Sequence, residues 1–580
     1  MRARYGAVLL LLALTTAACV GVPDSGPVVQ TRSQGDISSD SGIYFDPRPP
    51  QDGDSRSDIV RGFINAMTAT PIRTTRAREF LTADADAAWD PQKRTITYAL
   101  TPTPRETANG VSLTLTGADV LDSRGAWQGA LPEDDRTIAF PMSMEDGQWR
   151  IDSAPDALIL PETWFERNYR QKSLYFFDPT ASTLVPEPVY VPTGQALATT
   201  LTRGLLMGPA GRLERVTQSF VPRGLKVSVG VAVSDDGIAD IPLIGDAGPL
   251  TSNAVSLMMA QFAWTLRQDP TIEAIRVSID GAPVPLPGGA TSYRVDGGAE
   301  YDPAGLQASP LLYGLQDGRL VSGTANALGP VDGPLGNDDY GVRSIGVNLE
   351  ASRVAAVATS GTSLLTGPLT EGDDGRVDTV VSGATDLLRP AWDLADRIWL
   401  VDRAEGGARV SYVEDDTVSS LRVPGITGER VRSFLVSRDG TRLVALLRGR
   451  SGTYTLVVSR IEHGSAGRVV GATRAEELSV EGEIQLPIRA IAWRTPTSIA
   501  VLSPFTPSVA QVRLASVDGS PVGSDSSSST VEGRLRDIAG SPAAGEETYG
   551  VTSNSLIVLF GADRRITPID ESITEVVYVG

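Results

Sequence analysis

The chain contains one cysteine and one histidine, so few of its side chains could act as a strong nucleophile or a general base. Cys19 ends the segment TAAC near the N-terminus, and His463 lies in the segment RIEHG. A lone histidine excludes HExxH sites and other zinc sites with several histidines. No GxSxG elbow precedes His463. We expect His463 to be a surface residue in a loop after a strand, not a catalytic group.

Other catalytic and metal-binding motifs are also missing from the sequence. No glycine precedes a lysine, so there is no phosphate-binding P-loop. None of the three lysines, Lys93, Lys172 and Lys226, has a serine three residues before it, which excludes the SxxK acyl-transfer motif. Asp52-Gly53-Asp54 lacks the later ligands of a calcium loop. We expect no catalytic residue, metal or cofactor, although two carboxylates acting on a glycoside stay open as an alternative.

The N-terminal segment predicts a secretory signal that ends at the cysteine. Two arginines precede an apolar run from Ala7 to Leu14, and small residues follow it. The layout resembles a bacterial lipobox, in which diacylglycerol is attached to the thiol and the chain is cut before it. We expect a signal peptide over residues 1–18 and a Cys19 that carries diacylglycerol, with palmitate among its acyl groups. A plain signal peptide is the alternative, because Thr16 stands where a lipobox usually has leucine.

Composition restricts where the protein acts and what it binds. Loss of the signal would leave 49 of the 51 basic residues against 70 acidic ones, a net charge of −21. This charge argues against nucleic acid and anionic headgroups as electrostatic partners. The apolar run before Cys19 is shorter than the ~18–20 residues that span a bilayer. We therefore expect a lipid-anchored protein on the extracytoplasmic face of the cell membrane, with no intramolecular disulfide.

The first part of the mature chain predicts a tether and a small α+β domain. Residues 19–56 are rich in Gly, Pro, Ser and Asp and predict a lipidated flexible tether. Over residues 57–170, helical apolar spacing begins after Ser57 or Asp58, and a second helix is predicted from Arg76 to Trp89. Strands follow, and the last hairpin carries the sequence DGQWRID. This order resembles the NTF2-like cone.

Residues 171–290 predict a second domain of mixed α/β character. A helix over Gln195–Met207 stops at a Gly-Pro pair, SDDG turns a hairpin, and Ser252 begins a helix that runs to Arg267. The segments LTRGLLMGP, DDGIADI and SIDGAPV resemble the GerMN module of sporulation and germination proteins. That resemblance implies an interaction domain. We expect residues 288–302 to be an exposed link.

Residues 300–580 lose helical periodicity and repeat short β-rich segments. Five related segments begin at Val342, Leu387, Val431, Ile488 and Leu535. A period of ~40–50 residues predicts a β-propeller, for which we expect about six degenerate blades; a β-solenoid is the alternative. We expect a strand pair at Leu311–Val321 to close the ring against strands near Val576–Val579.

Two tryptophans recur at one position of this repeat. Trp392 and Trp493 each lie five residues after the start of their segment. An exposed pair would form an aromatic-binding site. We expect periodic packing between blades instead.

The order of a signal with its cysteine, a VPDSGPV tether, a cone-like domain, a GerMN module and a propeller resembles the LpqB lipoprotein family. This resemblance implies a membrane-anchored surface protein associated with the MtrAB two-component system. Its expected partner is the external domain of the sensor histidine kinase MtrB, with a regulatory role in cell-envelope and division control. Cys19 carries over as the lipidation site, and no catalytic residue does. Open alternatives are a surface protein that binds or hydrolyses cell-wall glycan with its propeller, and a purely structural envelope protein.

Overall fold

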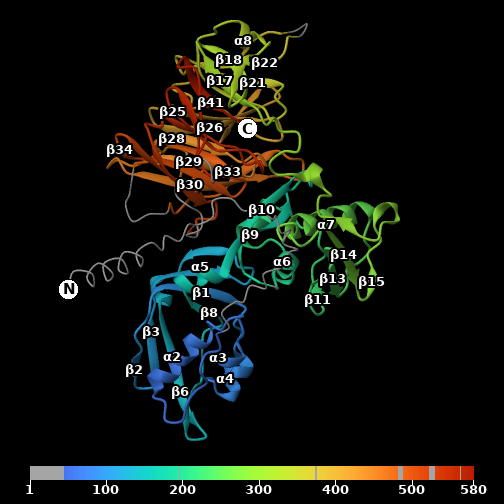
Figure 1. The fold of residues 1–580 in the computed structure, drawn as a ribbon, viewed down its shortest axis with the longest axis vertical. Coiled ribbons are helices and arrows are strands. Elements are labelled where there is room, and N and C mark those ends of the chain that lie inside the picture. The colour runs from blue at the N-terminus through green and yellow to red at the C-terminus, as the bar shows by residue number, and fades with distance from the viewer. Residues whose placement is uncertain (1–44, 195, 372–374, 481–486, 522–528, 562–563) are drawn as a thin grey trace, which may run out of the picture.

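Figure 1 shows the computed structural model of the protein, which describes residues 45–194, 196–371, 375–480, 487–521, 529–561 and 564–580. Cys19 and the predicted signal lie outside the described residues. The N-terminal α+β part lies at one end, the β-rich C-terminal part at the other, and strands β9 and β10 lie between them (Figure 1). The described residues contain no helix of the length and apolarity that a membrane span requires.

The N-terminal part packs short helices against two four-stranded sheets. The sheets have the orders β5-β4-β1-β8 and β2-β3-β6-β7, and their strands are β1 (Arg94–Leu100), β2 (Arg105–Thr107), β3 (Gly110–Thr114), β4 (Thr116–Asp122), β5 (Trp127–Ala130), β6 (Thr137–Glu145), β7 (Gln148–Ile151) and β8 (Leu158–Pro161). The helices are α2 (Arg56–Ala66), α3 (Thr75–Arg78), α4 (Ala83–Ala88) and α5 (Glu162–Asn168). Helix α2 buries the apolar face that its spacing predicts, including Phe63.

The start of this domain differs from the sequence expectation. Helix α2 is capped by Ser55, not by Ser57 or Asp58, because the Ser55 hydroxyl accepts from the Asp58 backbone N–H at 3.2 Å and the Asp58 carboxylate accepts from Ser55 N. The predicted tether is therefore ordered before it ends at residue 56, and Phe45 already pairs with Thr70 through two backbone hydrogen bonds.

The single helix expected from Arg76 to Trp89 is two helices, α3 and α4. Between them the backbone of Phe80 and Thr82 exchanges hydrogen bonds with Ile151 at the end of β7. The Thr82 side chain then begins α4 by accepting from Ala85 N.

The second part joins a long hairpin to a mixed sheet through two helices. The hairpin is β9 (Tyr169–Phe177) with β10 (Leu184–Pro192), and the helices are α6 (Leu197–Leu206) and α7 (Ser252–Leu266). The sheet contains β11 (Lys226–Val227), β12 (Ala232–Val233), β13 (Ile238–Ile244), β14 (Ala274–Ile279), β15 (Ala282–Pro283) and β16 (Tyr293–Arg294). Thr251, one residue before the expected Ser252, caps α7.

Residues 288–302 do not form the exposed link that we expected. Strand β16 pairs with β14, and the backbone carbonyl of Gly298 accepts from the Trp264 indole N–H at 2.9 Å. The Tyr301 ring packs edge-on against Phe177 with ring centroids 4.9 Å apart. The aromatic side chains of this segment complete the core of the second domain.

The described part of residues 312–577 forms six antiparallel sheets arranged as propeller blades. Blade 1 is β41 (Ile573–Val577), β17 (Leu312–Gln316), β18 (Arg319–Thr324) and β19 (Ala327–Pro330); blade 2 is β20 (Val342–Val347), β21 (Arg353–Ala358), β22 (Leu364–Pro368) and β23 (Asp378–Val381); blade 3 is β24 (Ala391–Trp392), β25 (Ile398–Ala404), β26 (Gly407–Glu414) and β27 (Thr417–Leu421); blade 4 is β28 (Val431–Val436), β29 (Arg442–Arg448), β30 (Tyr454–His463), β31 (Val469–Ala472) and β32 (Glu476–Glu477); blade 5 is β33 (Ala490–Thr495), β34 (Ser498–Thr506), β35 (Val509–Ser516) and β36 (Ser529–Glu532); blade 6 is β37 (Asp537–Ala539), β38 (Tyr549–Val551), β39 (Ser555–Val558) and β40 (Ile566–Pro568). A short helix, α8 (Pro334–Asn337), follows blade 1.

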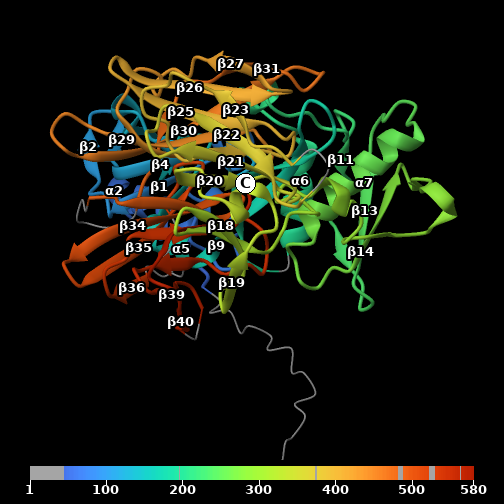
Figure 2. The same ribbon diagram turned by 90° about the horizontal axis from the view of Figure 1, so that it is seen from above.

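The propeller closes by pairing the end of the chain with its first strand. Strand β41 pairs with β17, with Tyr313 opposite Val577. A buried cluster joins Leu556 of blade 6 to Leu312 and Val576 of blade 1, so the last blade packs on the first. The C-terminus lies near the middle of the propeller when it is viewed from above (Figure 2). Closure buries the apolar faces of the first and last blades against each other, which an open array of blades would leave exposed.

Trp392 and Trp493 are buried between blades, which confirms the packing interpretation. The Trp392 indole N–H donates to the Gly346 carbonyl at 2.9 Å, and the Trp493 indole N–H donates to the Val436 carbonyl at 3.0 Å. Both carbonyls belong to the inner strand of the preceding blade. Each indole therefore fills the space between blades and satisfies its one polar atom there.

Candidate interaction sites at the domain junction and in the propeller channel

Of the two residues singled out in the sequence, Cys19 and His463, the structure describes only the histidine. Cys19 lies outside the described residues. His463 is the last residue of β30 and lines a pocket of about 310 Å³ together with Asp178, Arg397 and Asp439. The expectation of a loop histidine facing water is wrong, because β30 extends to residue 463 and residues of the second domain lie over its end.

The environment of His463 does not activate a nucleophile. Burial lowers its pKa to about 4, and the nearby Arg397 guanidinium acts in the same direction, so the ring is neutral at pH 7. Its Nε2 atom is buried and has no hydrogen-bond partner among the described residues. A general base for a serine or threonine would need a hydroxyl within hydrogen-bond reach.

A buried ion-pair cluster joins the second domain to the propeller. Glu187 of β10 accepts from both terminal nitrogens of Arg460, at 2.6 and 2.7 Å, and from Arg442 at 3.0 Å. Arg442 also reaches the Pro186 carbonyl and lies 3.4 Å from the Asp439 carboxylate. The side chain of Arg442 is 0% exposed and that of Glu187 is 8% exposed. Two arginines and two carboxylates thus balance their charges at a mostly buried junction.

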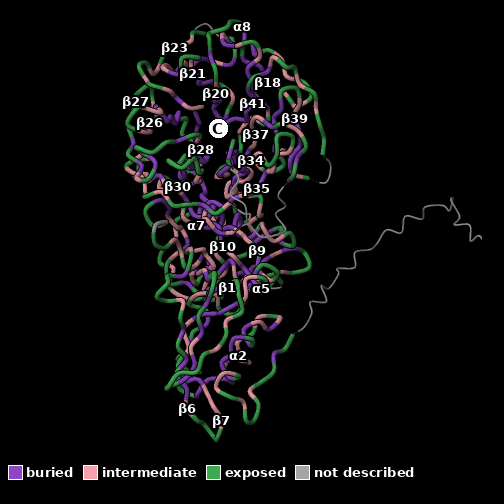
Figure 3. The backbone as a smooth tube through the Cα atoms, turned by 90° about the vertical axis from the view of Figure 1, so that its left-hand side faces the viewer, coloured by how far each residue is buried: buried purple, intermediate pink, exposed green. Residues whose placement is uncertain are grey.

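The same hairpin contacts the N-terminal domain. The Tyr190 backbone N–H donates to Gly125 O at 2.8 Å, and the Tyr190 ring packs on Phe165 and Trp127. The Tyr190 hydroxyl donates to Pro521 O of the propeller at 2.7 Å. Buried positions run along β9 and β10 between the two ends of the molecule (Figure 3). One hairpin therefore connects all three parts of the chain.

Glu187 is a site residue that the motifs do not predict, although its position in the sequence carries a signal. Strand β10 reads LVPEPVYVP, in which Glu187 is the only charged residue within an apolar run. A charge in a fully apolar strand predicts a buried and paired group. Its partners, Arg442 and Arg460, lie more than 250 residues further along the chain.

Beside this hairpin lies a cleft of about 1050 Å³ between the three parts of the chain. Its walls include Asp119 and Trp127 of the N-terminal domain, Glu187 of the second domain, and Arg460 and Asp518 of the propeller. Burial raises the pKa of Asp119 to about 6, and the charge of Glu162 adds to this effect. Burial also raises the pKa of Asp518. These carboxyl groups can hold a proton at a higher pH than ordinary surface acids.

The Asp119→Asn substitution is expected to stabilise the protein at pH 7 by about 1–2 kcal/mol, because it removes a carboxylate charge that burial disfavours. The effect is kept small because Asp119 is only half-buried and water still screens its charge. The folded pKa lies above the unfolded one, so in the native protein stability falls as pH rises from about 4 to about 6. Urea unfolding at pH 4 and pH 7 measures the difference. The exposed Asp134→Asn variant serves as the control, and an equal effect of the two variants at pH 7 would contradict the assignment.

A second charged cluster crosses the channel at the centre of the propeller. Arg389, at the start of blade 3, donates to Asp537 of blade 6 and to Glu575 of blade 1, both at 2.6 Å. The Ile345 backbone N–H of blade 2 also donates to Glu575 at 2.8 Å. The Arg389 side chain is 37% exposed because it faces the channel, whereas the Glu575 side chain is 6% exposed. The cluster links four blades across the ring.

At the other end of the channel Arg438 is buried among backbone carbonyls. It donates to Ala304 O and Val579 O at 2.8 Å, and to the Ser541 hydroxyl at 3.2 Å. Burial lowers its pKa to about 10, and Asp302 opposes this shift. Arg438 thus ties the entry and the exit of the propeller chain to blades 4 and 6.

The described residues contain no group of three or more His, Cys, Asp or Glu side chains able to hold a metal ion.

Comparison with known families covers each of these parts. Residues 49–166 match the model described as "Lipoprotein LpqB, N-terminal domain", residues 173–285 match "Sporulation and spore germination", and residues 318–563 match "Lipoprotein LpqB beta-propeller domain". Among solved structures, the chain is similar to the tandem GerMN domains of the sporulation protein GerM from Bacillus subtilis. The identity is 20%, the TM-score is 0.18, and the match covers 21% of this chain and 44% of that chain.

Curated relatives are similar over nearly the whole chain. Lipoprotein LpqB of Thermobifida fusca is 27% identical over 610 residues, covering 94% of this chain and 95% of that protein. Lipoprotein LpqB of Streptomyces coelicolor is 29% identical over 559 residues, covering 89% of this chain and 88% of that protein. With two LpqB domains, a germination-type domain between them and relatives that are similar over 88–95% of either chain, this protein belongs to the LpqB lipoprotein family.

Proposed function

We propose that this protein is a lipid-anchored, non-catalytic partner of a two-component sensor kinase of the MtrB type, on the extracytoplasmic face of the cell membrane. Its role is regulatory, in cell-envelope and division control. The proposal follows from the resemblance to the LpqB family and from the use that the chain makes of its buried charges. Cys19 carries the anchor, and the three folded parts present the surface that binds the kinase.

The observation that carries a non-catalytic role is the placement of the buried ionisable groups. Glu187, Arg442 and Arg460 join domains, and Arg389 with Glu575 joins blades. These groups pair with one another across the junctions between domains and between blades. His463, the only histidine, has no hydroxyl bonded to its ring among the described residues. Such an arrangement supports a stable surface for binding more than a reaction centre.

Cys19→Ser is expected to release the protein from the membrane, because the hydroxyl does not replace the thiol in thioether formation. Two or more acyl chains anchor firmly, whereas one chain gives only marginal binding. Fractionation after a high-salt wash, followed by immunoblotting, measures the release. The Ser25→Ala variant in the same segment should stay with the membrane. Retention of the Cys19→Ser protein after the wash would contradict lipid anchoring.

Binding of the kinase is tested by capture of its external domain on the full-length mature protein, with purified cell-wall glycan as the competing ligand. Saturable binding of the kinase domain, together with no release of soluble glycan fragments, supports the proposal. No kinase binding, or binding of the glycan alone, would contradict it.

One observation favours the second candidate function, binding or hydrolysis of cell-wall glycan. Asp119, with its pKa raised to about 6, lies close to Glu162 in the cleft that Trp127 also lines. A carboxyl group with a raised pKa beside a second carboxyl group is the pattern of a general acid in glycosidases. Release of glycan fragments by the native protein, abolished in Asp119→Asn and retained in Asp134→Asn, would establish this alternative and place its site at the junction, not in the propeller.

A further inference from the structure

Arginines at the second position of blades 2, 5 and 6 each donate to a backbone carbonyl of the next blade, a contact that we call a clasp. Arg343 donates to the Leu387 carbonyl at 2.7 Å, Arg489 donates to the Leu535 carbonyl at 3.0 Å, and Arg536 donates to the Ile573 carbonyl at 2.6 Å. Each carbonyl belongs to the residue that begins the related segment, or the inner strand, of the next blade. The periodic contact closes one end of the seam between neighbouring blades.

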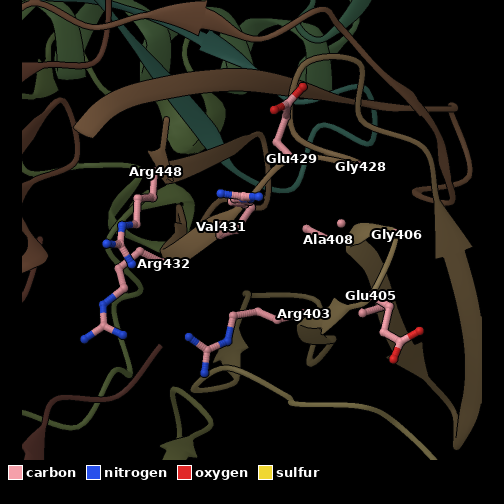
Figure 4. A pocket seen from close by; sticks show the side chains of 12 residues that line it. Arg403, Glu405, Gly406, Ala408, Gly428, Glu429, Val431, Arg432 and Arg448 are labelled. Carbon is pink, nitrogen blue, oxygen red and sulfur yellow. The ribbon is translucent and has the colours of Figure 1, made fainter. Parts of the chain in front are cut away.

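The clasp is absent between blades 3 and 4, and Arg432, at the second position of blade 4, makes no such contact with blade 5 among the described residues. The residue at the second position of blade 3 is Leu388, whose apolar side chain packs on the core between these blades. No guanidinium of blade 3 reaches Val431 among the described contacts. A pocket of about 460 Å³ lies at this seam, between the β25–β26 hairpin and the start of β28 (Figure 4).

Backbone pairing forms the floor of the pocket. Ala408 N donates to Glu429 O at 2.8 Å, and Gly428 N donates to Ala408 O at 2.9 Å. Gly407 has φ +100°, and a Cβ there would lie 2.0 Å from the Gly428 carbonyl oxygen. Only glycine permits this approach. The pocket is therefore set by the fold, and its volume falls within the range of small-ligand sites, which is about 300–1,000 Å³.

The pocket gathers positive charge on an acidic protein. Arg403, Arg430, Arg432 and Arg448 line it. Arg403 pairs with Asp386, but the side chains of the other three have no hydrogen bond or ion pair with any described residue. In Figure 4 the guanidinium groups of Arg403, Arg432 and Arg448 lie on one side of the opening, and the two glutamates that line it lie apart from them.

Guanidinium groups that line one pocket without a neutralising partner repel one another, and an anion bound between them would relieve that repulsion. The chain has 70 acidic residues, yet none of those described pairs with Arg430, Arg432 or Arg448. A single carboxylate is matched by one arginine fork, whereas a phosphate offers three oxygens to several arginines at once. The number of arginines and the compact volume therefore favour phosphate.

We propose that the pocket between blades 3 and 4 binds a phosphate group, borne by a small molecule or by a phosphate-containing polymer or lipid headgroup. Arg432 and Arg448 hold the phosphate oxygens. Arg430 adds a third positive charge, and the glycine floor fixes the shape of the pocket. This site is independent of the proposed kinase partnership, because its evidence is the pocket and the three lining arginines that have no described partner.

Isothermal titration of the full-length Cys19→Ser protein with inorganic pyrophosphate tests the proposal. We expect saturable binding that weakens as salt is raised. The Arg432→Gln/Arg448→Gln double variant is expected to lower the affinity at least about 10-fold, since it removes two charge-assisted contacts. Arg319→Gln, an exposed arginine of blade 1 with no described partner, is the matched control and should bind as the native protein does.

The melting temperature of each variant is measured first, and no change is expected because both substituted arginines are exposed. As a second variant, Arg448→Glu reverses one charge and should abolish binding of pyrophosphate. Sedimentation with phosphatidylglycerol vesicles distinguishes the source: vesicle binding that the double variant loses assigns the phosphate to a lipid, and pyrophosphate binding alone assigns it to a free or polymeric ligand. Unchanged pyrophosphate affinity in the double variant, or tighter binding of a glutamate-rich peptide than of pyrophosphate, would overturn the proposal.

Discussion

Glu187→Gln is expected to weaken the docking of the propeller on the rest of the protein by about 3–5 kcal/mol, the usual cost of removing one partner from a buried ion pair. The substitution keeps the size of the side chain but removes the charge that Arg442 and Arg460 share. Arg442 is fully buried, so water cannot replace the lost partner. The Asp439 carboxylate, 3.4 Å from the Arg442 guanidinium, is then the only carboxylate of the cluster left to balance the two arginines.

The measurement needs more than one melting temperature, because a three-domain chain does not have to unfold in a single step. Calorimetry should show the propeller transition separating from that of the N-terminal domains, and limited proteolysis should become faster at residues 287–302. A double-mutant cycle with Arg460→Gln isolates the pair. The control is Glu350→Gln, an exposed glutamate of the propeller. A coupling energy between Glu187 and Arg460 below ~1 kcal/mol would show that this ion pair does not hold the propeller on the second domain.

Arg389→Met is expected to destabilise the propeller at pH 7 by about 2–3 kcal/mol, because it leaves two carboxylates facing each other without a cation. The loss is below the ~3–5 kcal/mol of a fully buried pair, since the Arg389 side chain is 37% exposed. Asp537 and Glu575 both accept from Arg389, and burial already raises the pKa of Glu575. Without the arginine this pKa rises further. Protonation of Glu575 then relieves the repulsion, so the destabilisation should shrink as pH falls from 7 to 5.

Urea unfolding of both proteins at the two pH values measures this difference. Arg409→Met, which replaces an exposed arginine of β26 with no described partner, is the control and should cost little. Glu575→Gln in the Arg389→Met background should recover part of the loss. An equal loss at pH 5 and pH 7 would mean that packing of the side chain, not its charge, is what the propeller needs.

The local elements and the repeat could be predicted from the order of residues alone. Helical spacing predicted α2 and α6, because a helix that packs on a core buries one face at a period of 3.6 residues. A capping residue predicted the start of α7 to within one residue. The repeat beginning at Val342 predicted the blades, since related segments fold alike and bury their faces on one another. The two recurring tryptophans were correctly interpreted as packing between blades.

Pairing between distant residues was decided only by the tertiary structure. Glu187 stood out in its apolar strand, but the fold alone brings it to Arg442 and Arg460. Arg389 meets Glu575 only because β41 closes the ring on β17.

His463 shows the same limit. Its polar neighbours in RIEHG indicated a loop facing water, whereas burial of the ring depends on residues of the second domain that cover the end of β30. Local sequence determines which conformation a segment adopts, because propensities and caps act within a few residues. The partners of a buried charge depend on which surfaces meet, and only the folded chain determines that.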